Sequence, residues 1–98
     1  MSKFGEILKG EAPVLVYFNV KTEASYARME TELKAVAEYF GEALKLIEVE
    51  ALPGEAIVRA LRIAALPDFV LYKNEDMIWR TQGSKAAQDI INEIERFI

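Results

Sequence analysis

The sequence predicts one three-layer α/β domain over residues 1–98, with a mixed sheet of about four strands and helices on both faces. Residues 14–18 form an uninterrupted β-branched and aromatic run, which is typical of a central strand buried on both faces. Further along, two strand-like runs meet at a short turn around Asn74, so these two strands must be antiparallel. With 98 residues, 52% of them hydrophobic, the chain suits one small core and no second domain.

The first predicted element is a short helix. Phe4, Ile7 and Leu8 recur at helical spacing, and Gly10 follows as its C-cap. Pro13 then excludes any continuation of the helix into the strand at residues 14–18.

The longest predicted helix comes next. Thr22 or a neighbouring residue caps its start, Glu23 falls in its first turn, and Gly41 closes it. Its apolar residues recur on one face, which is formed by Met29, Leu33, Val36, Ala37 and Phe40. Residues 44–50 then alternate between the two faces of a strand, and the face that carries Glu48 and Glu50 is the more polar one.

The second half of the chain predicts a short helix over residues 55–62, a hairpin and a last helix. The hairpin strands are residues 69–73 and 77–81, joined by a turn over residues 74–76. The last helix starts at Gly83 and Ser84, and its core-facing residues are Ile90, Ile91, Ile94, Phe97 and Ile98. The order therefore combines a strand-helix-strand unit, with its right-handed crossover, and a strand-strand-helix unit.

Composition excludes several classes of function. The chain has no cysteine and no histidine, so it can form no disulfide, and the commonest nucleophiles, general bases and metal ligands are missing. We therefore expect no cofactor, no metal and no enzyme activity. The net charge of −4 argues against nucleic acid and anionic membranes as partners. No secretory leader or membrane segment stands out, which predicts a cytoplasmic protein.

Several short motifs together resemble the thioredoxin family. These are the strand at residues 14–18, a helix that ends at Tyr39-Phe40-Gly41, the Ala65-Leu66-Pro67 segment before a hairpin, and Gly83 before the last helix. Their order and loop lengths agree with that family over nearly the whole chain. The resemblance implies a thioredoxin-like fold and a cis bond between Leu66 and Pro67.

The redox machinery of that family is replaced. Where thioredoxins carry Trp-Cys-Gly-Pro-Cys, residues 22–26 read Thr-Glu-Ala-Ser-Tyr, so Glu23 and Tyr26 stand at the two cysteine positions. Tyr17 stands at the position of the family's buried aspartate, and Asn19 at that of a tryptophan. The resemblance therefore predicts a redox-inactive member, without disulfide oxidoreductase activity.

A second departure concerns the start of the chain. Thioredoxins usually begin with a strand that pairs beside the strand matching residues 44–50, whereas only three residues precede the first predicted helix here. The first family strand is thus expected to be missing, which leaves residues 44–50 as an open sheet edge. Lys45, Glu48 and Glu50 place charges along it, a common protection against edge-to-edge pairing.

The former redox corner predicts a candidate binding site. In thioredoxin-like proteins the redox turn, the cis-proline and a glycine before the last helix line a shallow groove for an extended peptide. The matching residues here are Thr22, Glu23, Tyr26, Leu66, Pro67 and Gly83. The alternative is that residues 22–26 merely start a helix well. Glu23 in a first turn would repel an anion, which disfavours glutathione as a ligand.

Two other groups of residues have competing interpretations. Tyr72 and Trp79 on the hairpin suit sheet packing, with ligand stacking as the alternative. Glu48 and Glu50 share one face of a strand and suit a solvated surface, with a pair of catalytic carboxylates as the alternative.

Three hypotheses for function follow. The first is a non-catalytic module that binds a protein or an extended peptide, through the candidate groove or through the open strand edge. The second is a structural or assembly protein that dimerises through the edge at residues 44–50, so the chain would be a monomer or a weak homodimer. The third, which rests on resemblance alone, is an accessory protein in cell redox homeostasis.

Overall fold

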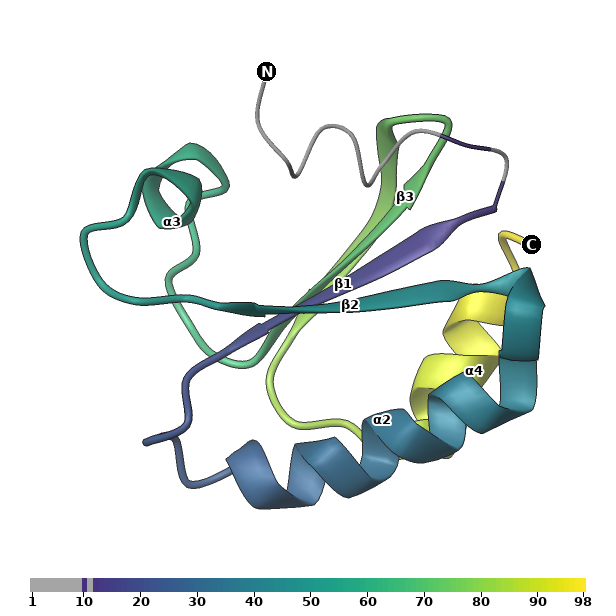
Figure 1. The fold of residues 1–98 in the computed structure, drawn as a ribbon, viewed down its shortest axis with the longest axis horizontal. Coiled ribbons are helices and arrows are strands. Elements are labelled where there is room, and N and C mark those ends of the chain that lie inside the picture. Colours follow the sequence, from purple (N-terminus) through teal and green to yellow (C-terminus); the bar gives the residue numbers. More distant parts are fainter. Residues whose placement is uncertain (1–9, 11) are drawn as a thin grey trace.

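The computed structural model describes residue 10 and residues 12–98 (Figure 1). The helix expected around Phe4, Ile7 and Leu8 lies outside the described residues. The described elements are β1 (Val14–Asn19), α2 (Tyr26–Phe40), the 3-10 helix η1 (Gly41–Ala43), β2 (Lys45–Glu50), α3 (Ala56–Ala60), β3 (Asp68–Lys73), β4 (Asp76–Gln82) and α4 (Ala87–Glu95).

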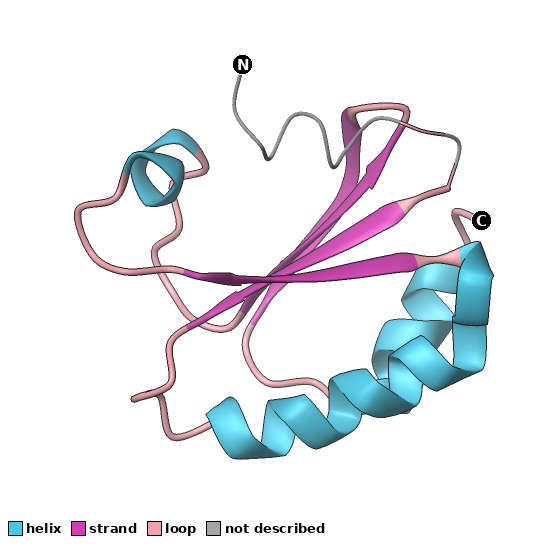
Figure 2. Cartoon of the chain, viewed as in Figure 1, coloured by secondary structure: helices cyan, strands magenta, loops and turns pink. Residues whose placement is uncertain are grey.

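The four strands form one mixed sheet in the order β2-β1-β3-β4. β1 is parallel to β2 and antiparallel to β3, and β3 is antiparallel to β4. Helices α2 and α4 lie side by side on one face of the sheet, and α3 lies on the other (Figure 2). The predicted α/β architecture, a mixed four-stranded sheet between two helical layers, is therefore confirmed.

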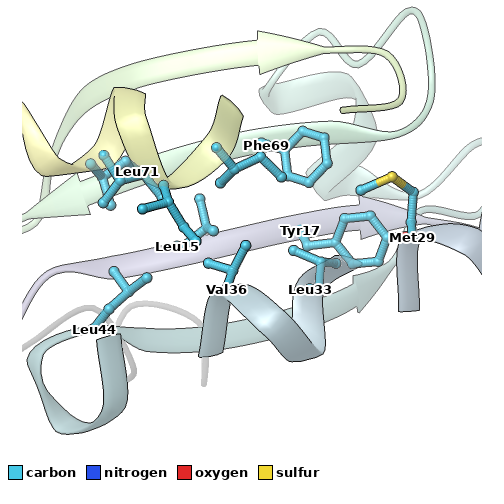
Figure 3. Packing of buried hydrophobic residues seen from close by; sticks show 11 residues of the cluster. Leu15, Tyr17, Met29, Leu33, Val36, Leu44, Phe69 and Leu71 are labelled. Carbon is cyan, nitrogen blue, oxygen red and sulfur yellow. The ribbon is translucent and has the colours of Figure 1, made fainter. Parts of the chain in front are cut away.

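β1 is buried along its whole length because it lies between two strands and under helices on both faces. Its side chains alternate between two cores. The α2-side core contains Leu15, Tyr17, Met29, Leu33, Val36, Leu44, Phe69, Leu71, Ile90, Ile91 and Ile94 (Figure 3). The α3-side core contains Val14, Val16, Phe18, Ala51, Val70 and Tyr72. Each fully buried aliphatic or aromatic side chain contributes about 1.5–3 kcal/mol to folding, so this strand anchors both cores.

The start of α2 differs from the sequence prediction. The helix begins at Tyr26, and residues 20–25 form turns in which the Val20 carbonyl accepts from the Glu23 N–H at 3.0 Å. Ser25 occupies the cap position without a side-chain cap bond, because its backbone is already helical (φ −77°, ψ −9°) and not in the extended conformation typical of a cap. Its hydroxyl accepts from the Asn19 amide at 3.4 Å. Thr22 is therefore not the cap, and Glu23 is not in the first turn. The argument that Glu23 repels an anion at the helix start is consequently wrong.

The end of α2 is as predicted. Gly41 adopts a φ of 55°, a region that favours glycine, and its N–H donates to the carbonyl of Ala37. The predicted apolar face is also confirmed, since Met29, Leu33 and Val36 are buried.

The last helix starts later than predicted. α4 begins at Ala87, and its first N–H donates to Oε1 of Glu32 on α2 at 2.7 Å. A side chain from another helix thus satisfies a group that a local cap would otherwise serve. Ile90, Ile91 and Ile94 are buried and Phe97 packs against the α2-side core, but Ile98 is 42% exposed and does not face it.

The predicted hairpin is confirmed as β3 and β4. Asn74 and Glu75 form a two-residue turn with φ of 52° and 69°, the signs of a type I′ turn. Leu71 pairs with Trp79 whereas Tyr72 pairs with Met77, so Ile78 is an additional residue in a bulge. The bulge shifts the register, and this shift decides which β4 residue meets the start of β3. On the other face of the sheet, α3 is shorter than residues 55–62, and Ile57, Val58 and Leu61 pack on the α3-side core.

Candidate functional site

Three connections meet at one end of the sheet. The register pairs Phe18 with Asp68 and Asp68 with Gln82, so β1 and β4 end where β3 begins. The β1–α2, α3–β3 and β4–α4 connections therefore gather at the same end (Figure 1). All six predicted site residues belong to these connections or to the first residue of α2.

The structure brings Pro67 and Gly83 together. The Gly83 N–H donates to the Pro67 carbonyl at 2.8 Å, and Gly83 has a φ of 92° that favours glycine. The Leu66–Pro67 bond is cis. Pro67 is buried and Leu66 packs against the α3-side core. The side chains of Leu66 and Pro67 therefore point largely into the protein.

The backbone of the residues just before Pro67 lies nearer the surface than the Leu66 and Pro67 side chains do. Ala64 and Ala65 are exposed, and Leu66 is half-buried. In the described part of the chain, the N–H and C=O groups of these three residues make no backbone hydrogen bond. Backbone donors and acceptors just before Pro67 thus remain free at the surface, at the end of the sheet where the β1–α2 connection with Thr22 and Glu23 also lies.

The structure does not bring the Tyr26 hydroxyl to Pro67. Thr22 and Glu23 are exposed, but Tyr26 is half-buried and its hydroxyl donates to Oε1 of Glu48 at 2.8 Å. This bond raises the pKa of Tyr26 well above its ordinary value. Since Glu48 is on β2 and Pro67 precedes β3, the hydroxyl and the proline lie on opposite sides of β1.

Buried, uncharged side chains occupy the positions of the family's aspartate and tryptophan. Tyr17 and Asn19 are 1% and 2% exposed, and the Asn19 amide donates to the Tyr17 hydroxyl at 2.6 Å. The Tyr17 ring stacks on Phe69 with a centroid separation of 5.4 Å. Burial raises the pKa of Tyr17 further above its ordinary value, so this position offers no proton acceptor at neutral pH.

Sequence reasoning missed a buried ion pair beside Pro67. Asp68 is fully buried, and its carboxylate accepts from Nε of Arg80 at 3.0 Å and from Nη2 at 2.5 Å. Gln82 Nε2 donates to the same carboxylate at 3.0 Å. The sequence contained one signal of this ion pair, because Asp68 is a single acidic residue at the start of an apolar strand. A buried carboxylate needs a partner, and the hairpin places Arg80 nearby.

Glu48 and Glu50 are both exposed, as expected for a solvated strand face, but no sequence pattern indicated the contacts that Glu48 makes. Glu48 associates with Glu30 and Tyr26 of α2 rather than acting together with Glu50. Burial, followed by the hydrogen bond with Glu30, raises the pKa of Glu48, while the Tyr26 hydroxyl lowers it. For the hairpin aromatics the packing interpretation holds. Tyr72 belongs to the α3-side core, and Trp79 is half-buried against the α2-side core.

The fold and this corner define a class of protein: an α/β module with the sheet order, loop arrangement and cis-proline of a redox fold, but with no thiol. The chain belongs to the thioredoxin family, whose description "Thioredoxin" matches residues 1–96. Among the described residues, β2 lies at one edge of the sheet, and the family's first strand would lie beyond that edge.

Similar proteins agree with this assignment. The chain is 32% identical over 95 residues to "Thioredoxin Y, chloroplastic" of Oryza sativa subsp. japonica, covering 96% of this chain and 56% of the rice protein. It is 26% identical over 91 residues to a thioredoxin-like protein of Synechocystis, covering 92% and 84% of the two chains. The chain thus spans only about half the length of the rice relative.

Solved structures show the same fold. A structure titled as thioredoxin-2, a component of malaria parasite protein secretion machinery, matches with a TM-score of 0.83 and 24% identity, covering 90% of this chain and 85% of that one. Mitochondrial thioredoxin 3 of Saccharomyces cerevisiae matches with a TM-score of 0.85 and 16% identity, covering 97% and 88%. Among the described residues, no helix has the length and apolar character needed to cross a membrane.

Proposed function

We propose that this chain is a redox-inactive member of the thioredoxin family that binds an extended peptide or a protein segment. The observation that carries the proposal is the free backbone of residues 64–66 at the end of the sheet, within the part of the chain that the structure describes. Unpaired backbone N–H and C=O groups at the surface can bind an extended chain through main-chain hydrogen bonds.

The surroundings of this segment support the proposal. Thr22 and Glu23 are exposed on the β1–α2 connection at the same end of the sheet, where their side chains are available to a bound chain. The hydrogen bond from the Gly83 N–H to the Pro67 carbonyl fixes the residue that directly follows this segment, so the backbone groups of the segment are held in place before a ligand arrives. Such preorganisation lowers the entropic cost of binding.

The absence of thiols supports binding without chemistry. No residue of the chain can attack a disulfide, because all 98 residues lack cysteine. A ligand held here is therefore released unchanged. The candidate contact residues are Thr22, Glu23, Tyr26, Leu66, Pro67 and Gly83, of which Tyr26 contributes its ring rather than its hydroxyl.

The test uses a matched pair of exposed alanines. Ala65→Arg places a long charged side chain over the free backbone, whereas Ala35→Arg makes the same change on the exposed surface of α2. The parent and both variants are used to select binders from a library of short unstructured peptides displayed on phage.

We expect the parent and Ala35→Arg to enrich the same peptides, and Ala65→Arg to lose them by at least about tenfold. Circular dichroism verifies that both variants are folded. Equal enrichment by all three proteins would place binding elsewhere on the molecule, and no enrichment by the parent would count against the proposed function.

A further inference from the structure

A second surface, independent of residues 64–66, follows the outer edge of β2. The Lys45 N–H donates to the Pro13 carbonyl at 2.9 Å, and the Ala51 N–H donates to the Asn19 carbonyl at 3.0 Å. Since backbone groups alternate in direction along a strand, the odd-numbered residues of β2 bond to β1. The N–H and C=O groups of Leu46, Glu48 and Glu50 therefore point away from the sheet, and no other described strand pairs with them.

A groove runs beside this edge. It has a volume of about 410 Å³ and lies between α2 and the α2-facing side of the sheet. Its apolar lining comes from Tyr17, Leu33, Ala37 and Leu46, and its polar lining includes Glu30 and Glu48. An added strand would project every second side chain toward this groove, because side chains alternate between the faces of a sheet.

The charges at the groove select the kind of side chain that fits. Glu30 and Glu48 both line the groove, with their carboxyl groups in contact, and Glu50 continues the acidic line along the edge. Lys34 lines the groove, and Lys21 lies with Glu48 and Glu50 at the adjoining hollow, so these two lysines offset only part of the charge. A cation opposite Glu48 would relieve the contact between the two carboxylates, and a further anion would worsen it.

We propose that the outer edge of β2 binds an extended peptide as an additional antiparallel strand, with an apolar residue in the groove beside Leu46 and a lysine or arginine opposite Glu48. The six residues of β2 are long enough to pair with a peptide strand of ordinary length. On the other face of the sheet, Ile47 and Val49 are half-buried and present apolar partners to the alternate residues of the peptide.

A second copy of this chain fits the edge less well. In an antiparallel pairing that keeps the helices of both copies on matching faces, even-numbered residues must lie opposite even-numbered residues. Glu48 then lies opposite Leu46, Glu48 or Glu50 of the other copy, and in each register it comes near a glutamate of that copy, either directly opposite or on the diagonal. Like charges placed this way destabilise a sheet, so the structure favours a basic peptide.

The experiment uses two synthetic peptides, Lys-Val-Lys-Val-Val-Thr and Glu-Val-Glu-Val-Val-Thr, each labelled for fluorescence anisotropy. In antiparallel pairing, their first, third and fifth residues lie opposite Glu50, Glu48 and Leu46. We expect the protein to bind the lysine peptide about tenfold more tightly than the glutamate peptide. We also expect the lysine peptide to slow hydrogen exchange at the amides of Leu46, Glu48 and Glu50. Equal affinities, or unchanged exchange at these amides, would overturn the proposal.

Two variants at one position separate charge from main-chain pairing. Glu50→Pro removes an outward-pointing N–H, a position where an edge strand tolerates proline, and Glu50→Gln removes the same charge but keeps the N–H. We expect Glu50→Pro to bind the lysine peptide about fivefold more weakly than Glu50→Gln. Equal binding by the two variants would show that main-chain pairing does not contribute.

Ala65→Arg distinguishes this surface from the one in the proposed function. The lysine peptide should bind Ala65→Arg as it binds the parent, and loss of binding would move the peptide to residues 64–66. Sedimentation of the free protein tests the remaining occupant. A concentration-dependent dimer that Glu50→Pro abolishes would show that the edge serves a second copy, and would overturn the peptide proposal.

Discussion

Asp68 and Arg80 form two parallel hydrogen bonds that tie the start of β3 to its hairpin partner β4. The carboxylate is fully buried, while the Arg80 side chain is 26% exposed. The bond to Asp68 raises the pKa of Arg80 above its ordinary value, so the guanidinium stays charged. With the third bond from Gln82, the residue next to Pro67 is held by three donors.

Removing Arg80 should strongly destabilise the protein. Arg80→Met leaves a buried carboxylate with Gln82 as its main donor, and breaking one side of a buried pair costs about 3–5 kcal/mol. Urea denaturation at neutral pH measures the change in the free energy of unfolding. The control is Arg96→Met, because Arg96 pairs with Glu93 on the exposed surface and should change stability by less than about 0.5 kcal/mol. Similar losses in both variants would contradict a special role for the buried pair.

Neutralising Glu48 should stabilise the protein at neutral pH. Burial and Glu30 raise the pKa of Glu48 above its ordinary value of 4.5, against the opposing effects of Tyr26 and Lys21. The folded state therefore binds this proton more tightly than the unfolded chain, and that stabilisation is complete below about pH 4.5 and lost as the pH rises through the folded pKa.

Glu48→Gln should accordingly unfold at a higher urea concentration than the parent at neutral pH, with a gain below about 1 kcal/mol because the group is partly exposed. The gain should shrink as the pH falls, since the parent's carboxyl becomes protonated. Tyr17 and Lys34 also face this carboxyl or its groove and are unchanged in the variant. Exposed Glu42→Gln is the control, and a gain that does not vary with pH would refute the electrostatic cause.

Glu32 should stabilise the start of α4. Its Oε1 accepts the Ala87 N–H at 2.7 Å, and loss of such a cap bond costs about 1 kcal/mol. Glu32→Ala should lower the unfolding free energy by that amount and speed hydrogen exchange at the Ala87 amide. Glu38→Ala on the exposed surface of the same helix should do neither. Unchanged exchange at Ala87 would show that another group serves this N–H.

The turn before α2 should still accept a disulfide. The Tyr26 N–H donates to the Glu23 carbonyl at 3.0 Å, and residues joined by such a turn have Cα atoms less than about 7 Å apart, near the range of disulfides. The double variant Glu23→Cys with Tyr26→Cys should form an intramolecular disulfide on mild oxidation, detected by mass spectrometry.

This double variant should nevertheless reduce insulin disulfides poorly. Tyr17 is a neutral phenol whose pKa is raised by burial, so it cannot accept a proton from a thiol at neutral pH. Rapid insulin reduction by the variant would show that the position of Tyr17 does not limit the chemistry. The parent, which has no cysteine, provides the baseline.

The sequence predicts those parts of the fold that depend on local pattern. The buried strand at Val14, the apolar face around Leu33, the Gly41 cap and the tight turn at Asn74 each follow from neighbouring residues, and each is present. Burial of the hairpin aromatics follows from the same patterns, whereas the position of residues 44–50 at the sheet edge was expected only from the family resemblance.

Contacts between distant residues account for the errors. The late start of α4 depends on Glu32, 55 positions before Ala87, and periodicity within α4 contains no trace of that bond. The Tyr26 hydroxyl meets Glu48, 22 positions away, so its direction away from Pro67 depends on how α2 lies over β2. The bulge at Ile78 shifts the register so that Asp68 pairs with Gln82, and no local sequence pattern predicts this bulge.

The stacking of Tyr17 on Phe69 makes the loss of thiol chemistry difficult to undo one residue at a time. An aspartate at position 17 would leave the volume of an aromatic ring empty and bury a charge there, at a cost of several kcal/mol. Cysteines regained alone would lack a proton acceptor, and the acid regained alone would only weaken the fold. Each single substitution toward the family's redox residues is therefore neutral or harmful, so the packing of Tyr17 against Phe69 opposes a stepwise return of thiol chemistry.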